Sequence, residues 1–400
     1  MDVALNHPLK PDSNPVDPKQ VQDPAQVADA TRLAAQRELA QSFSTLQELV
    51  AAARRSLSQA TWDMLSGGSD SEATLRRNRM ALDSLALRQR VLVDVRNLDT
   101  TTTLLGKSLP LPVFIAPIGN FLQYADPRGA AAVACAAVSK QLPCFISTAA
   151  RPGIEAVAKA VDQPLIFQLY VRGDRQWVGD ILDRAKAAGY DALCVTVDRA
   201  YYSRRERDMI NRHLVREGGG DASHQASITW DDVLWMKQRM GVPLILKGIA
   251  TAEDARLAVE HAVDVVYVSN HGGRQLDHAQ ASIEVLPEVA EAVDGRAEVL
   301  MDGGILRGTD IVKAVALGAR AVGIGKLHGW ALAAAGEPGV VRMIELLELE
   351  IRSALGLMGV TSLRELGPHS VRAATPVSTG SVTSAYPMYE AALRDGEGRP

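Results

Sequence analysis

Continuous apolar runs of strand length recur along most of the chain and alternate with stretches of helical periodicity. Runs that are apolar throughout are typical of strands buried on both faces of a parallel sheet. Strand and helix units of this kind in long series predict a closed (β/α)8 barrel, the TIM barrel of the α/β class, over about residues 112–355. The eight predicted strands span residues 112–117, 143–148, 164–170, 191–198, 242–248, 263–270, 297–304 and 320–326.

An open doubly wound sheet is the alternative architecture. Such a sheet is expected to carry a glycine-rich fingerprint directly after its first strand. The segment PIGNF at residues 117–121 follows the first apolar run and does not form that fingerprint. The pattern therefore favours the barrel.

The two ends of the chain differ in composition from the middle. Residues 1–24 contain five prolines among polar residues, and residues 25–60 carry Leu and Val at helical spacing. The last residues, from 380 onward, are rich in Ser, Gly and Pro. These patterns predict a Pro-rich arm and helix over 1–44, a barrel with an N-terminal helical extension over 45–375, and a flexible C-terminal tail over 376–400.

Composition narrows the class of protein. The formal net charge is −4 and hydrophobic residues make up 47% of the chain, which excludes an overall basic nucleic-acid-binding protein and a wholly disordered chain. No run of about 18 apolar residues occurs, so no membrane-spanning helix is expected. The N-terminus lacks the apolar core of a secretory signal. Because the three cysteines lie in apolar stretches without metal-ligand spacing, we expect a reduced, cytoplasmic protein.

Polar residues gather where the predicted strands end. The carboxyl ends of barrel strands converge on one mouth, which carries the active site in enzymes with this fold. These candidates are Ser147, Gln168, Tyr170, Thr196, Asp198, Lys247, Ser269, Asn270, His271 and Asp302.

Five titratable residues at or near these strand ends have side chains suited to catalysis or to binding an anion. His271 suits a general base because its ordinary pKa lies near neutrality. Asp198 is placed to orient the imidazole ring and to stabilise its protonated form. Arg205 and Arg274 have the geometry to bind a carboxylate with paired hydrogen bonds. Lys247 ends an apolar strand and needs an anionic partner, which is either a neighbouring side chain or a cofactor.

The last two strand ends carry a phosphate-binding pattern. Glycines follow strands seven and eight, at Asp302-Gly303-Gly304 with Arg307 beyond them, and at Gly325-Lys326. Barrels often bind phosphate between these two loops through backbone N–H groups and a helix N-terminus. A phosphate site and a lysine in one mouth predict a mononucleotide such as FMN. No metal site is predicted, because the eight histidines show no metal-ligand spacing.

A long polar segment, residues 213–228, follows the fourth predicted strand. Loops at this position in a barrel border the active site. Two interpretations stay open, a lid over the mouth and a simple surface excursion.

The motif Ser-Asn-His-Gly-Gly-Arg-Gln-Leu-Asp at residues 269–277 resembles the signature of the FMN-dependent α-hydroxy acid oxidases and dehydrogenases, which include glycolate oxidase, lactate oxidase and monooxygenase, and mandelate dehydrogenase. Residues 167–170, 196–198, 246–248 and 302–304 support the resemblance, which extends over about 45–370.

This resemblance implies oxidation of an (S)-2-hydroxy acid to the 2-oxo acid, with oxygen or another carrier as electron acceptor. His271 would remove the substrate proton while hydride passes to flavin N5, Asp198 would pair with His271, and Tyr170 would hydrogen-bond near the substrate hydroxyl. Arg205 and Arg274 would bind the substrate carboxylate. The resemblance also implies a homotetramer or octamer. It further implies a set of cofactor-binding residues, namely Pro117, Ile118 and Gly119 beside N5, Ser147, Gln168, Thr196 and Ser269 around the ring, Lys247 at N1 and O2, and Asp302, Gly303, Gly304, Arg307, Gly325 and Lys326 at the phosphate end.

Four positions depart from the family pattern. Met64 stands where the family has a tyrosine that helps to bind the carboxylate, and Ala149 stands where plant glycolate oxidases have a tryptophan. Both changes predict a substrate pocket open to a bulkier or less acidic substrate. Lys326 replaces an arginine at the phosphate, which keeps the charge but loses the planar fork. Gly119 replaces an alanine and hints at an acceptor other than oxygen.

Two alternative functions remain. The same FMN barrel would act on a bulkier or non-standard substrate, or the barrel would bind a ligand without turnover. The second alternative is disfavoured, because His271, Arg205 and Arg274 are all intact.

Overall fold

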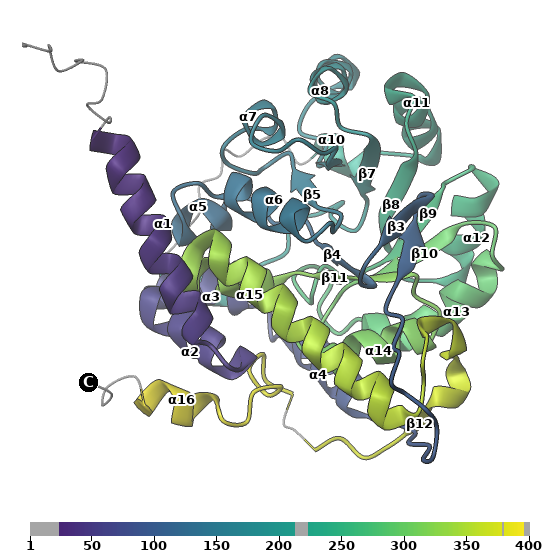
Figure 1. The fold of residues 1–400 in the computed structure, drawn as a ribbon. Coiled ribbons are helices and arrows are strands. Elements are labelled where there is room, and N and C mark those ends of the chain that lie inside the picture. Colours follow the sequence, from purple (N-terminus) through teal and green to yellow (C-terminus); the bar gives the residue numbers. More distant parts are fainter. Residues whose placement is uncertain (1–23, 213–222, 378–379, 396–400) are drawn as a thin grey trace, which may run out of the picture.

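The computed structural model describes residues 24–212, 223–377 and 380–395. Its centre is a parallel sheet of eight strands in the order β4-β11-β10-β9-β8-β7-β6-β5. A single bridge between Ile115 and Cys144 brings the two outer strands together, so the sheet is nearly closed into a barrel (Figure 1). The (β/α)8 prediction is confirmed.

Each of the eight strands overlaps one of the predicted apolar runs, because these residues are buried on both sides. Their bounds are β4 (Val113–Ile115), β5 (Phe145–Ser147), β6 (Ile166–Leu169), β7 (Ala192–Thr196), β8 (Leu244–Ile249), β9 (Val265–Val268), β10 (Glu298–Met301) and β11 (Ala321–Ile324). Of these, only β8 extends beyond its predicted run, by one residue.

Side chains alternate between two hydrophobic cores along each strand. In β4, Phe114 points into the barrel, where it meets the edge of Tyr267 at 5.3 Å between ring centroids, whereas Val113 and Ile115 face the helices. The interior core also contains Leu104 and Leu109. They belong to a hairpin of β2 (Thr102–Leu104) and β3 (Lys107–Leu109), which closes the end of the barrel at which the strands begin.

Helices surround the sheet and follow its strands (Figure 1). They are α6 (Ala130–Ser139), α7 (Ile154–Ala158), α8 (Arg175–Ala187), α11 (Trp230–Met240), α12 (Ala252–Glu260), α13 (Ser282–Val293), α14 (Gly308–Ala316) and α15 (Lys326–Met358), with the shorter α5 (Phe121–Ala125), α9 (Glu206–Ile210) and α10 (Ser223–Ala226) in the loops between strands and helices. The long α15 is kinked at Ala335 and Gly336, just before Pro338.

An N-terminal helical extension packs on the barrel. It comprises α1 (Pro24–Ser42), α2 (Leu46–Ser56), α3 (Gln59–Ser66) and α4 (Ala73–Asp83). A capping box between Thr45 and Glu48 fixes the start of α2, whose apolar face packs on α15. The predicted extension therefore exists, and its helices continue beyond residue 60 into α3 and α4. The predicted arm at residues 1–23 lies outside the described residues.

The C-terminal segment returns to the body of the molecule. Strand β12 (Val371–Ala373) pairs with β1 (Leu85–Leu87), after two 3-10 turns at Leu363–Glu365 and Pro368–Ser370. Residues 380–395, predicted from the sequence to lie in a flexible tail, pack on the protein instead. Tyr386 is buried and donates a hydrogen bond to the Leu306 carbonyl at 2.9 Å, and α16 (Tyr389–Asp395) lies against α2. The free energy gained by burying the Tyr386 ring outweighs the preference of the surrounding polar residues for solvent.

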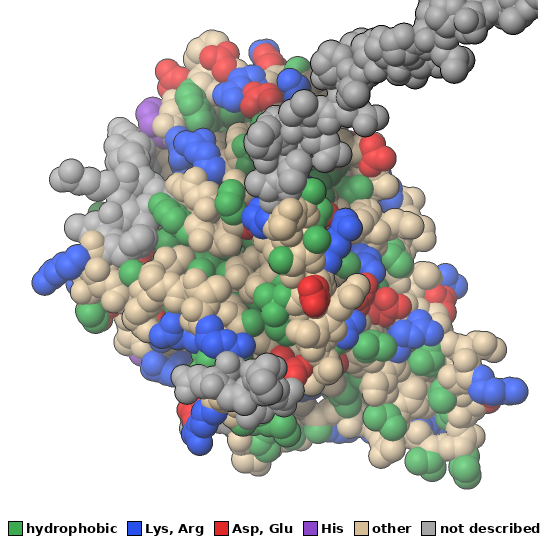
Figure 2. Space-filling view, turned by 60° about the vertical axis from the view of Figure 1, so that its left-hand side comes forward, with side chains coloured by type: hydrophobic (Ala, Val, Ile, Leu, Met, Phe, Trp, Pro, Cys, Tyr) green, Lys and Arg blue, Asp and Glu red, His purple; other side chains and the backbone are tan. Residues whose placement is uncertain are grey.

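Basic and acidic side chains are interspersed on the face shown in Figure 2, in keeping with a net charge close to zero. Among the described residues no helix is long and apolar enough to span a membrane.

Candidate active site

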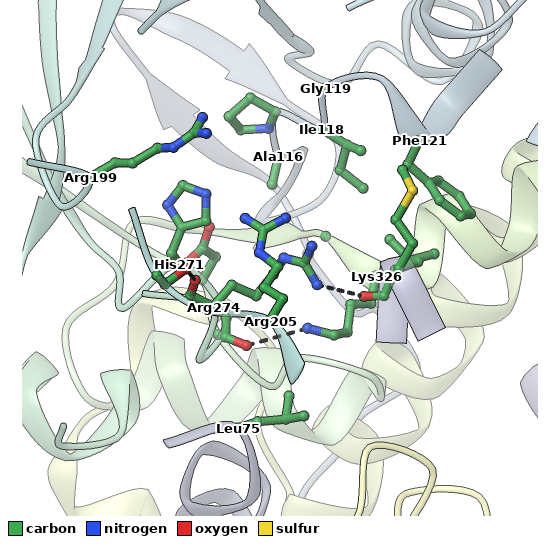
Figure 3. Close-up of a pocket in the computed structure, with 18 of the residues that line it drawn as sticks. Leu75, Ala116, Ile118, Gly119, Phe121, Arg199, Arg205, His271, Arg274 and Lys326 are labelled. Carbon is green, nitrogen blue, oxygen red and sulfur yellow. Dashed lines mark hydrogen bonds between the residues drawn. The ribbon is translucent and has the colours of Figure 1, made fainter. Parts of the chain in front are cut away.

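A cavity of about 550 Å³ opens at the carboxyl ends of the barrel strands. Its size is within the usual range for small-molecule sites. The predicted site residues that line it are Met64, Pro117, Ile118, Gly119, Ala149, Tyr170, Arg205, Lys247, His271, Arg274, Asp302, Gly303, Gly304, Gly325 and Lys326 (Figure 3). Residues 200 positions apart thus meet in one place.

His271 occupies an unusual backbone conformation directly after β9. Its φ is +58°, and Gly272 and Gly273 continue with φ of +64° and +74°. A non-glycine residue in this region is strained, and such strain persists mainly at functional sites. The two glycines are needed because their φ angles are costly for any residue with a Cβ. This turn directs the imidazole ring into the cavity.

The imidazole is held between a carboxylate and a phenol. Its Nδ1 lies 2.9 Å from Asp198 Oδ1, and its Nε2 lies 3.1 Å from the Tyr170 hydroxyl. Because the Asp198 carboxylate accepts a hydrogen bond from Nδ1–H, the lone pair is on Nε2, on the Tyr170 side of the ring, where both residues line the cavity. Burial lowers the pKa of His271 below its ordinary value and outweighs the opposing charge of Asp198. The neutral, base-competent form therefore prevails at pH 7.

Asp198 stays ionised beside this ring. Burial opposes its charge, but His271, Lys247 and Arg199 outweigh that cost and lower the pKa of Asp198. The carboxylate approaches the backbone of β8 so closely that a Cβ on Gly248 would lie 2.6 Å from the Asp198 Cβ. Gly248, whose φ is +113°, is therefore required for Asp198 to reach His271.

Two arginines face the cavity from separate loops. Arg274 donates hydrogen bonds to the Gly67 and Leu65 carbonyls at 2.7 and 3.4 Å. Burial and the nearby charge of Arg205 lower the pKa of Arg274 to about 9. Two half-buried guanidinium groups that repel each other are stabilised by an anion between them, so this pair fits a substrate carboxylate. Met64, from α3, lines the same cavity with a thioether that donates no hydrogen bond.

Lys247 belongs to a buried polar cluster at the floor of the cavity. Its ammonium donates to Ser269 Oγ at 2.6 Å and pairs with Asp302 at 3.4 Å. Burial disfavours its charge, but Asp302 and Asp198 outweigh burial and raise the pKa of Lys247. Tyr267 and Ser269 also donate to Asp302, at 2.8 and 2.5 Å. The Lys247 ammonium is therefore a positive charge held in a fixed position at the floor of the cavity.

The opposite end of the cavity has the features of an anion site. Lys326 is the first residue of α15 and follows Gly325, where a Cβ would meet nothing within 4 Å. The Lys326 ammonium donates a hydrogen bond to the Gly272 carbonyl at 3.3 Å. Burial and the charge of Arg274 lower the pKa of Lys326 well below its usual value. A phosphate would restore its charge and meet a helix N-terminus.

The buried polar groups beside the cavity fit a flavin ring as well. Gln168 donates to Thr196 Oγ1 at 2.8 Å, while its own Oε1 is buried without a hydrogen-bond partner in the described structure. A buried acceptor without a donor costs about 1–3 kcal/mol. The N–H groups of a bound ring system would satisfy such an acceptor. FMN therefore fits this site at both its ends.

Six predicted site residues do not line the main cavity. Asp198 and Ser269 bond the cavity residues His271 and Lys247. Thr196 is the neighbour of Lys247 in the β7–β8 register, and Gln168 bonds Thr196. Ser147 lines a small separate void below it and accepts a hydrogen bond from the Ala149 N–H. Arg307 turns away altogether and pairs with Glu350 at 2.6 Å, so its predicted role at the phosphate lacks geometric support. Its neighbour Leu306 lines the cavity instead.

The sequence analysis missed many of the cavity residues, of which Arg79, Arg199 and Tyr202 bear most on the site. Arg79, from α4, donates to the Gly304 carbonyl at 2.9 Å. Arg199 and Tyr202 lie in the loop after β7. Arg199 directly follows Asp198, and that adjacency is the one sequence signal that pointed to it. The predicted lid overlaps residues 213–222, which lie outside the described residues; of its remainder, Gln225 is buried and bonds Val171 and Thr196.

Comparison with known proteins adds an independent line of support. A family model described as FMN-dependent dehydrogenase matches residues 53–224 and 219–373. An L-lactate oxidase from Nostoc sp. is 40% identical over 343 residues, covering 78% of this chain and 94% of the relative. Glycolate oxidase from Spinacia oleracea is 37% identical over 354 residues, covering 82% of this chain and 96% of the relative. The crystal structure of a mandelate oxidase superposes with a TM-score of 0.78 at 38% identity, covering 84% of this chain and all of that one.

Proposed function

Because the chain belongs to the family of FMN-dependent dehydrogenases and is an FMN-dependent oxidoreductase, we propose that it oxidises (S)-2-hydroxy acids to 2-oxo acids with His271 as the base. The observation that supports this most is the His271 Nε2 atom, which faces the cavity while Asp198 holds Nδ1 at 2.9 Å. FMN, when bound, supplies the acceptor for the two electrons that leave the substrate carbon.

His271 and its neighbours would handle the proton. The substrate hydroxyl would take the place of the Tyr170 hydroxyl at Nε2, and its O–H bond would break as the proton moves to that nitrogen. The hydrogen on the same carbon would leave with both electrons of its C–H bond, as the hydride equivalent that FMN would accept, so that a C=O bond forms. Asp198 would stabilise the resulting imidazolium, and Tyr170 would donate to the substrate oxygen. Arg205 and Arg274 would hold the substrate carboxylate and fix the orientation of the carbon.

An anaerobic spectrum of the FMN-loaded protein tests this function. We expect the flavin absorbance to bleach on addition of at least one (S)-2-hydroxy acid from a panel that spans small, aromatic and dicarboxylate side chains. Readmission of air then shows whether oxygen or another carrier is the acceptor. A flavin that no acid in the panel reduces would contradict the proposed function while leaving the fold and cofactor unchanged.

A second candidate keeps the chemistry but changes the substrate. Met64 and Ala149 both line the cavity, and neither donates a side-chain hydrogen bond. The site would then favour a bulkier substrate over lactate or glycolate. The same panel separates the two candidates, because only long or branched acids would reduce the flavin at low concentration.

Replacing Lys326 with methionine is expected to weaken FMN binding by about 10–100-fold, because a charged hydrogen bond contributes roughly 1.5–3 kcal/mol. Titration of the apoprotein with FMN, followed by quenching of flavin fluorescence, measures the Kd. The Lys326→Arg variant serves as the control and should stay close to the wild type. An unchanged Kd in Lys326→Met would show that the FMN phosphate does not bind at this end of the cavity.

A further inference from the structure

Arg199 is one of several arginines that line the cavity, and its surroundings differ from those of Arg205 and Arg274. It is half-buried in the loop after β7. Its Cζ lies 4.9 Å from the ring centroid of Tyr170 and 5.1 Å from that of Tyr202. Two aromatic rings therefore hold the guanidinium in place.

No acceptor in the described part of the chain takes the N–H groups of Arg199. The hydrogen bonds and ion pairs of the described residues include none from this guanidinium. The ring faces attract its charge but offer no lone pair to its five donors. The other cationic groups named at the site do have partners, since Lys247 pairs with Asp302 and Arg274 donates to backbone carbonyls. Arg199 thus carries donors without acceptors.

The positive charge of Arg199 acts on Tyr170 from a different side of the cavity than the charges of Arg205 and Arg274. Burial raises the pKa of Tyr170, and the positive charge of Arg199 opposes that shift. Figure 3 shows the Arg199 side chain on one side of the His271 ring, with Arg205 and Arg274 on the other. A ligand that spans the cavity past His271 therefore meets cationic groups at both of its ends.

The cavity has room between these two ends. Ala149 and Met64 line it, and Gly119 has no side chain of its own. Tyr202 forms part of the wall beside Arg199, and 53% of its surface is exposed. Arg199 shares this cavity, of about 550 Å³, with His271 and Arg205.

We propose that Arg199 is a specificity-determining residue that binds a second carboxylate, at the far end of the substrate side chain, so that the preferred substrates are (S)-2-hydroxy dicarboxylates. This inference rests on the proposed function, in which Arg205 and Arg274 bind the first carboxylate. A carboxylate in the plane of the guanidinium would satisfy donors that the aromatic rings leave free.

Matched pairs of substrates test the proposal. (S)-malate and (S)-2-hydroxybutyrate share a carbon count, as do (S)-2-hydroxyglutarate and (S)-2-hydroxyvalerate, and each pair differs in a terminal carboxylate or methyl group. We expect the wild-type kcat/KM to favour a dicarboxylate over its partner by about 10–100-fold, since a hydrogen bond to a charged group contributes roughly that factor.

The Arg199→Met variant should lose this preference, because its kcat/KM should fall about 10–100-fold more for each dicarboxylate than for the monocarboxylate partner. Arg199→Lys should retain part of the preference, because it keeps the charge without the planar fork. Arg175→Met is the matched control: Arg175 also stacks on an aromatic ring, with its Cζ 4.3 Å from the Trp235 ring centroid, but it is exposed and does not line the cavity, so the ratio should not change. Equal losses on both members of a pair would reduce Arg199 to a positioning residue for Tyr170 and overturn the proposal.

Binding of the reaction products gives a second readout that needs no turnover. Calorimetry should show tighter binding of 2-oxoglutarate than of 2-oxovalerate to the FMN-loaded protein, and Arg199→Met should abolish the difference. If monocarboxylates reduce the flavin and no dicarboxylate preference exists, this inference fails and the proposed function stands. If no hydroxy acid reduces the flavin but the binding difference depends on Arg199, the anion site stands and the proposed function fails.

Discussion

Replacing His271 with glutamine is expected to slow anaerobic reduction of the bound flavin by roughly 10²–10⁴-fold, the usual contribution of a positioned general base. Glutamine fills a similar space but cannot accept a proton at this position. Stopped-flow absorbance at saturating substrate measures the rate, and the visible spectrum of the variant checks that FMN remains bound. Flavin reduction at a near-normal rate in His271→Gln would show that His271 is not the general base.

The pH dependence of the wild-type protein checks the same assignment. Because burial lowers the pKa of His271, the ring is neutral at pH 7 and becomes protonated only on acidification below its ordinary range near 6.5. A protonated ring accepts no further proton, so kcat/KM should be flat around pH 7 and fall as the pH drops below about 6.5. The Asp198→Asn variant loses the partner that raises this pKa, and its acid limb should move to still lower pH. A limb displaced to higher pH in that variant would contradict the pairing.

Replacing Arg79 with methionine is expected to lower the free energy of unfolding by about 3–5 kcal/mol, the cost of leaving a buried charge without its partner. Arg79 lies in α4, with 4% of its side chain exposed, and donates to both carboxylate oxygens of Asp310 at 2.7 and 2.8 Å. It also bonds Asp83 at 2.7 Å and the Gly304 carbonyl at 2.9 Å. Its loss should therefore loosen the Gly303-Gly304 loop and weaken FMN binding as well.

Urea denaturation of the apoprotein measures the stability change of Arg79→Met without the contribution of the cofactor. Arg239→Met is the control, because Arg239 pairs with Asp183 at the surface, where both side chains are about half exposed. Exposed pairs contribute at most about 1 kcal/mol. Equal losses in the two variants would show that the Arg79 cluster contributes no more than an ordinary surface pair.

Local patterns in the sequence were sufficient for the fold and for most of the candidate site. A continuous apolar run is buried on both faces wherever it lies in a parallel sheet, so the eight strands were readable from composition and spacing alone. The carboxyl ends of such strands must converge in a barrel, and this brought His271, Asp198 and Lys247 into one predicted mouth. Each of these residues lies next to a strand that fixes its place.

The tertiary structure decided the residues whose direction depends on a distant partner. Arg307 was predicted at the phosphate from its position after Gly304, but Glu350 on α15 draws it away from the cavity. Arg79 reaches the cavity because Asp310, 231 residues away, anchors its guanidinium. Tyr386 is buried although its surroundings in the sequence are polar. Spacing along a chain determines which face of a strand or helix a residue occupies, whereas the direction of a long side chain depends on contacts that form only when remote segments pack together.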